Sequence, residues 1–155
     1  GWRISLLPLL EHYWKNAASE RRSLLWLRLL KQMKRQGEPK PLRLAPLHMD
    51  VHAGNLVNQP DGIKLIDWEY AGDGDVALEL AAITLASNVD SERLLHAYAQ
   101  LSHIPPEALA RQVARWQPWV IMLMASWYEC RWSQTQDRTF ITLADEAWSQ
   151  LRDKN

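Results

Sequence analysis

The chain has one stretch whose residue types and spacing could do chemistry, and it contains His48, Asp50, Asn55 and Asp67. A carboxylate such as that of Asp50 can accept the proton of a hydroxyl group or orient that hydroxyl for attack. The Asn55 amide and the Asp67 carboxylate offer hard oxygen atoms, which are the donors that Mg²⁺ prefers. Because bound Mg²⁺ neutralises the charge of a triphosphate, these residue types point to chemistry on phosphate groups.

A short hairpin is predicted to bring the two oxygen donors together. Residues 63–66 form an apolar run typical of a strand, and it is reached from residues 56–57 through residues 59–62, which end in an Asp-Gly pair typical of a hairpin turn. A strand, a tight turn and a second strand therefore lie between Asn55 and Asp67. Both side chains could then converge on one metal ion.

Residues 48, 50 and 55 have the spacing H-x-D-x-x-x-x-N, which is that of the catalytic loop in protein-kinase-like phosphotransferases. One alternative is a loop whose polar side chains only satisfy nearby backbone groups. Another is a metal-dependent hydrolase, in which His48, Asp50 and His52 share a zinc ion. The hydrolase interpretation leaves the spacing of Asn55 and Asp67 unexplained.

The sequences LHMDVHAGNLV at residues 47–57 and KLIDWEYAGDGDVALELA at residues 64–81 together resemble the aminoglycoside phosphotransferase and choline kinase family. Members of that family use ATP to phosphorylate hydroxyl groups of small molecules. The resemblance implies that Asp50 is the catalytic base. It also implies that Asn55 and Asp67 are Mg²⁺ ligands.

The same resemblance implies that His48 and Glu79 support the catalytic loop and that the chain is the C-terminal lobe of a protein-kinase-like fold. The N-terminal lobe of such a kinase covers the phosphates with a loop and contacts them with a strand lysine, and residues 1–155 contain no counterpart. Residues 72–74 form the only G-x-G, which we interpret as a flexible turn. We therefore expect a single domain that lacks the nucleotide lobe and is inactive alone.

The expected fold class is mainly α with a small β-hairpin (α+β), because apolar residues recur at helical spacing along most of the chain. Gly37 and Pro39 should end the second helix, and Pro118 should kink or divide a later one. Residues 42–47 should be extended, and Asp75 should cap the helix that follows it. The expected helices cover residues 5–18, 20–36, 76–88, 91–102, 106–132 and 138–152.

Composition excludes some classes of protein. Eighteen basic and eighteen acidic residues give a net charge of zero, which argues against a nucleic-acid partner held by a broad positive field. The most apolar run, residues 119–128, is too short to cross a bilayer, so no membrane partner is expected. The single cysteine, Cys130, cannot form an intrachain disulfide and fits a cytoplasmic location.

Two groups of residues could recognise a substrate. Glu69 and Asp73 lie in a stretch without lysine or arginine; they are either solvated or a negative field for a cationic substrate. The stripe that includes Trp116 and Trp119 is either core or part of an aromatic wall for a cation. The wall residues that we name for such a pocket are Trp127, Tyr128 and Trp132.

Together these features predict an ATP- and Mg²⁺-dependent phosphotransferase that acts on the hydroxyl of a small cationic alcohol. Thiamine is the leading substrate candidate, since the resemblance favours it, and choline, ethanolamine or an aminoglycoside are alternatives. A different class remains open, namely a non-catalytic module that binds a small cation without turning it over. Turnover of ATP separates that module from a kinase, and zinc content separates the hydrolase.

Overall fold

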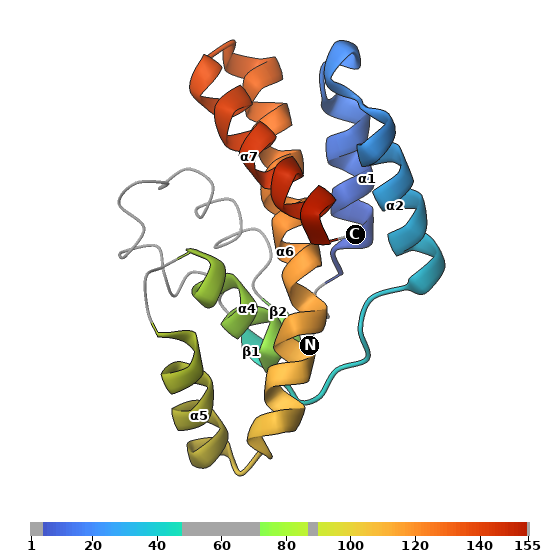
Figure 1. The fold of residues 1–155 in the computed structure, drawn as a ribbon. Helices are drawn as coiled ribbons and strands as arrows, with labels where there is room; N and C mark the ends of the chain where they lie inside the picture. The colour runs from blue at the N-terminus through green and yellow to red at the C-terminus, as the bar shows by residue number, and fades with distance from the viewer. Residues whose placement is uncertain (1–4, 48–71, 87–89, 155) are drawn as a thin grey trace. The chain divides into compact units, whose positions relative to one another are not determined.

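The computed structural model describes residues 5–47, 72–86 and 90–154, and Figure 1 shows the arrangement of their helices and strands. The fold class predicted from the sequence is confirmed, since these residues are mainly helical with one small antiparallel sheet. The elements are α1 (Leu7–Asn16), η1 (Ser19–Arg21), α2 (Leu24–Gln36), β1 (Leu44–Leu47), β2 (Gly72–Asp75), α4 (Val76–Ala86), α5 (Ser91–Ser102), α6 (Pro106–Thr135) and α7 (Arg138–Lys154).

The chain divides into two compact units. Unit 1 comprises residues 1–4 and 39–120, so it contains β1, β2, α4, α5 and the first half of α6. Unit 2 comprises residues 5–38 and 121–155, so it contains α1, η1, α2, the second half of α6 and α7.

The first two helices of unit 2 begin and end at recognisable signals. Glu38 Oε2 accepts hydrogen bonds from Leu6 N and Leu7 N at 3.1 and 3.4 Å, and so satisfies amides at the start of α1. Ser23 caps α2, because its hydroxyl oxygen accepts from the third amide of the helix. Gly37 ends α2 with a φ of 74°, a backbone conformation that glycine adopts readily, which confirms the predicted stop.

Trp26 lies at the centre of unit 2 and is fully buried. Its ring centroid lies 5.1 Å from that of Trp14 on α1 and 5.1 Å from that of Trp148 on α7. Such aromatic pairs contribute about 0.5 to 1.5 kcal/mol beyond the burial of their area. Figure 1 shows α1 beside α2, and Trp26 ties these two helices to α7.

A buried ion pair joins three elements of the same unit. Glu129 on α6 is fully buried and accepts two hydrogen bonds from the Arg21 guanidinium, at 2.9 and 3.0 Å. It also accepts from Trp148 Nε1 at 2.8 Å, while Arg21 donates further to Asp145 at 2.6 Å. Because a buried carboxylate is costly unless it is fully bonded, these contacts are what allow Glu129 to lie in the core.

Unit 1 contains the sheet, in which β1 and β2 pair antiparallel with Leu44 opposite Asp75 and Leu47 opposite Gly72. The predicted extended conformation of residues 44–47 is confirmed. The flexible turn predicted for residues 72–74 is wrong, because these residues form β2. Glycine is unfavourable in a strand, but backbone pairing with β1 and the contacts of the buried Asp75 side chain compensate.

The helix α4 is mostly apolar, and its residues from Val76 to Ala82 are buried except for the half-buried Glu79, which fits a helix whose first turns lie in a core. The long helix α6 runs without interruption through Pro118, so Pro118 does not divide the helix, and the alternative of a kink there stays a prediction. Proline removes one helical hydrogen bond, and the burial of Trp116 and Trp119 on either side of it stabilises the helix against that loss.

Replacing Glu129 by glutamine should lower the free energy of unfolding of this chain by about 2 kcal/mol, because Arg21 and Trp148 then share a neutral acceptor whose amide group opposes one of them. Urea denaturation at pH 7 measures the change. Glu20→Gln is the control, since Glu20 is exposed and makes no hydrogen bond or ion pair with another described residue. Equal stability of the two variants would contradict the role assigned to Glu129.

Candidate functional site

The predicted site residues fall partly outside the described residues. His48, Asp50, Asn55, Asp67 and Glu69 lie in residues 48–71, and so does the hairpin predicted for residues 56–66. The structure therefore leaves their predicted roles as predictions. The others lie on three elements: Asp73 on β2, where the structure describes its backbone, Glu79 on α4, and Trp127, Tyr128 and Trp132 on α6.

The strands β1 and β2 flank the predicted catalytic segment on both sides. β1 ends at Leu47, directly before His48, and β2 begins at Gly72, a few residues after Asp67. Leu47 and Gly72 are partners in the register, and opposed residues of an antiparallel pair lie about 5 Å apart between Cα atoms. The sheet therefore fixes the two ends of the segment that carries the candidate base and metal ligands.

Asp75 ends β2 and is 2% exposed. Its Oδ1 accepts from Ala77 N at 3.2 Å and from Arg43 N at 3.4 Å. Its Oδ2 accepts from Gln112 Nε2 at 2.7 Å and from Trp116 Nε1 at 2.9 Å. The bond to Ala77 confirms the predicted cap of α4, and the other bonds attach the end of β2 to the residue before β1 and to α6.

Sequence analysis predicted the capping role of Asp75 and did not identify Gln112 or Trp116 as its partners. A usable signal was present in α6, where Gln112 interrupts a stripe of apolar residues that includes Leu109, Val113 and Trp116. All four side chains are buried. A polar residue on an apolar stripe requires a buried hydrogen-bond partner, although the sequence does not say which one.

Glu79 lies in the first turn of α4 and is half-buried. A carboxylate in the first turn of a helix is stabilised by the positive end of the helix dipole. This placement in unit 1, on the helix that follows β2, is compatible with the supporting role that the sequence predicts. That role remains a prediction, because its expected target lies in residues 48–71.

The structure brings two of the three predicted aromatic pocket residues into contact. The rings of Trp127 and Tyr128 are T-shaped with centroids 5.7 Å apart, and Trp127 also meets Phe140 of α7 at 5.9 Å. Both predicted residues are buried, as expected for core positions. The Arg131 guanidinium carbon lies 5.7 Å from the Trp127 ring centroid, so this ring already contacts a cation.

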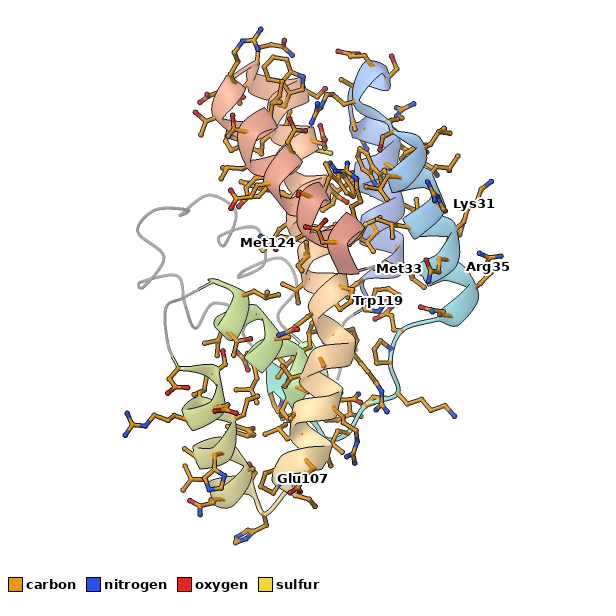
Figure 2. All side chains as sticks on the ribbon, viewed as in Figure 1. Lys31, Met33, Arg35, Glu107, Trp119 and Met124 are labelled. Carbon is orange, nitrogen blue, oxygen red and sulfur yellow. The ribbon has the colours of Figure 1, made fainter. Side chains whose placement is uncertain are left out.

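Trp132, the third predicted pocket residue, is half-buried. An open groove of about 800 Å³ lies elsewhere, between α5 and the start of α6 in unit 1, and it includes Glu107, which Figure 2 labels at that end of α6. None of the predicted site residues that the structure describes lines this groove. Within residues 5–47, 72–86 and 90–154 we find no cluster of metal-ligating side chains and no helix suited to spanning a membrane.

Cys130 lies beside Glu129 on α6 and is buried. Its thiol donates a hydrogen bond to the backbone oxygen of Tyr13 at 3.3 Å. Burial, with a smaller contribution from the Glu129 carboxylate, raises the pKa of the Cys130 thiol to about 12. Such a thiol forms little thiolate at neutral pH and is not suited to act as a nucleophile.

The family comparison agrees with the fold and the motif. The family described as "Phosphotransferase enzyme family" (APH) matches residues 2–119, and this chain belongs to it. That family is protein-kinase-like, in agreement with the mainly helical lobe and small sheet seen here.

Two curated relatives are similar to this chain over almost its whole length. The thiamine kinase of Escherichia coli (strain K12) is 58% identical to the chain over 151 residues, and the thiamine kinase of Shigella dysenteriae serotype 1 (strain Sd197) is equally identical. In both cases the match covers 97% of this chain and 55% of the relative, so the chain spans about half the length of the curated relatives it matches. No solved structure matches the chain.

In the native chain at pH 8, Cys130 should react with iodoacetamide about a thousandfold more slowly than in 8 M urea, because a pKa raised from 9.0 to about 12 lowers the thiolate fraction by that factor. Mass spectrometry of timed samples measures both rates. The unfolded thiol ionises above about pH 9 while the native thiol stays protonated, so stability should also fall between pH 9 and pH 12. Native and unfolded rates within tenfold of each other would contradict the assignment.

Proposed function

We propose that this chain is part of an ATP-dependent phosphotransferase that acts on the hydroxyl of a small cationic alcohol, with thiamine as the substrate and thiamine phosphate as the product. The observation that carries the proposal is the 58% identity to thiamine kinases over 97% of the chain. The H-x-D-x-x-x-x-N spacing supports it, because it supplies the residue types that phosphoryl transfer requires.

In this proposal Asp50 accepts the proton of the substrate hydroxyl, or orients that hydroxyl for in-line attack on the γ-phosphate. Asn55 and Asp67 would hold Mg²⁺, and their amide and carboxylate oxygens fit that ion. Bound Mg²⁺ supplies neutralisation of the phosphate charge. One neutral and one anionic ligand bind Mg²⁺ weakly, so the ion should bind appreciably only when nucleotide is also bound.

The sheet supports this proposal within unit 1. The partners Leu47 and Gly72 tie the chain immediately before His48 to the chain shortly after Asp67. Residues that act together in phosphoryl transfer contribute mainly by being held in place. The pairing of β1 with β2 on either side of the catalytic segment supplies such a constraint.

The proposed recognition of the cation involves Glu69 and Asp73, which belong to a stretch without lysine or arginine. The aromatic residues proposed to contact the cationic ring are Trp127, Tyr128 and Trp132. Of these, Trp132 has the most accessible side chain, while Trp127 already contacts Arg131. A ring contact with a cation contributes roughly 0.5 to 2 kcal/mol to affinity.

The matched relatives are longer than this chain. We propose that the loop and lysine that cover the nucleotide phosphates belong to the part of such a protein that residues 1–155 do not contain. On this proposal the isolated chain has no kinase activity. Because ATP is the phosphate donor, the cytoplasm is the compartment that we infer for the complete protein.

In the complete protein, Asp50→Asn should lower kcat by at least about a hundredfold, because the amide cannot accept the hydroxyl proton. Nucleotide affinity should stay within twofold, since Asp50 is not proposed to contact ATP. A coupled assay of ADP release measures kcat, and nucleotide titration measures the affinity. Unchanged turnover in the variant would exclude Asp50 as the base, and stoichiometric zinc in the purified protein would favour the hydrolase instead.

The complete protein should show a kcat/KM for thiamine at least tenfold above those for choline and for an aminoglycoside, which corresponds to about 1.4 kcal/mol. All three are assayed at the same Mg²⁺ and ATP concentrations. A tenfold preference for either competitor would replace thiamine as the substrate and leave the phosphotransferase assignment in place.

A further inference from the structure

Asp75 has more hydrogen-bond donors than a helix cap requires. A cap uses one side-chain oxygen that accepts from an amide in the first turn, and Oδ1 does this for Ala77 N at 3.2 Å. The two donors to Oδ2 are Gln112 and Trp116 of α6, which lie 37 and 41 residues further along the chain. These two bonds are not needed to start α4. They attach the end of β2 to α6.

Gln112 contacts the outer end of β2 and the chain that leads into β1. Its Nε2 donates to Asp75 Oδ2 at 2.7 Å and to the backbone oxygen of Lys40, a few residues before β1, at 2.6 Å. Its Oε1 accepts from Arg115 Nη1 at 2.9 Å, so every polar atom of the amide has a partner. The side chain is 3% exposed. Its hydrogen bonds with Asp75, Lys40 and Arg115 fix its orientation.

Trp116 supplies the second bond to the same oxygen. Its Nε1 donates to Asp75 Oδ2 at 2.9 Å, and its ring is 3% exposed. An indole N–H has one hydrogen to donate and accepts nothing, so the ring has one bonded orientation. Trp119, one turn along α6 and labelled in Figure 2, contacts Trp116 by its ring, with centroids 6.2 Å apart, and makes no hydrogen bond with Asp75.

These contacts lead from α6 to the predicted catalytic segment. Gln112 and Trp116 hold Asp75 at the outer end of β2, and the inner ends of the two strands, Leu47 and Gly72, border residues 48–71. We propose that Gln112 and Trp116 are positioning residues for phosphoryl transfer, acting through Asp75 on β1 and β2, the two strands that border the predicted catalytic segment. This inference rests on the proposed function, because it names the reaction that the positioning serves.

The test uses Trp116→Phe and Gln112→Met in the complete protein, since the new side chains fill most of the same space and cannot donate to Asp75. Trp116→Phe removes only the bond to Asp75, whereas Gln112→Met also removes the bonds to Lys40 and Arg115. The matched control is Trp119→Phe, which removes the same indole N–H one turn away. We expect each of the two variants to lower kcat about tenfold, because small misplacement of reacting groups is costly, and the control to change it less than twofold. The KM for the alcohol should stay within twofold.

Two readouts separate positioning from loss of folded protein. The Mg²⁺ concentration for half-maximal rate should rise about fivefold in both variants, because misplaced ligands bind the ion less well, whereas a smaller folded fraction leaves it unchanged. Amide hydrogen exchange measured by mass spectrometry should be faster in peptides that cover residues 43–47 and 72–76. The exchange readout is independent of kinase activity.

The proposal is overturned if Trp116→Phe and Gln112→Met leave kcat and strand exchange unchanged, or if Trp119→Phe lowers kcat equally. It is also overturned if kcat falls without a change in the Mg²⁺ requirement or in exchange. If Trp116→Phe does not fold, Gln112→Met decides. An unmodified protein without kinase activity would refute the proposed function, and the exchange experiment would then still show whether α6 holds the strands.

Discussion

A carboxylate can remain charged inside a protein only if its oxygens are given donors, and each unit of this chain is arranged around one such group. In unit 1 the carboxylate is Asp75, and in unit 2 it is Glu129. Each accepts an indole N–H, from Trp116 and Trp148 respectively, at 2.9 and 2.8 Å. An indole adds a donor and a large apolar surface at once, so it satisfies the carboxylate and excludes water from it.

The second donors of the two carboxylates differ, and the difference has consequences. The charge of Glu129 is neutralised by the Arg21 guanidinium, which forms a bidentate pair with the carboxylate. Asp75 receives only neutral donors, so its negative charge is not cancelled by a described ion pair. Neutral donors therefore orient the Asp75 carboxylate, while the charged guanidinium of Arg115 bonds to Gln112 instead.

Much of the local structure could be predicted from the sequence, because the signals were local. The helix predicted for residues 91–102 has these bounds in the structure, where Asp90 caps its start, and the end of α2 follows from Gly37. The strand β2 was missed because its glycines disfavour strands, and its partner β1 lies almost thirty residues earlier. Partners of buried polar groups were missed for the same reason: nothing near Glu129 in the sequence indicates Arg21, 108 residues away.

The same distinction between local signals and partners far away in the sequence applies to the candidate site. Its proposed chemistry comes from the spacing of Asp50, Asn55 and Asp67 and stays a prediction, because these residues lie outside the described ones. The contact of Gln112 with Asp75 could not be predicted, because a buried amide in α6 does not indicate which carboxylate it contacts. Helical spacing placed Trp119 on an apolar stripe and left core and aromatic wall as alternatives, and the structure shows its side chain buried.

The division of unit 2 into two distant parts bears on synthesis of the chain. Apart from its first four residues, unit 1 is continuous from residue 39 to residue 120, whereas unit 2 joins residues 5–38 to residues 121–155. A ribosome therefore releases all of the continuous part of unit 1 before α7 exists. Until residues 121–155 follow, Trp26 lacks Trp148 and Arg21 lacks Glu129 and Asp145, although Trp26 can already contact Trp14 of α1. Chaperones that shield apolar surfaces would act on the N-terminal helices during translation.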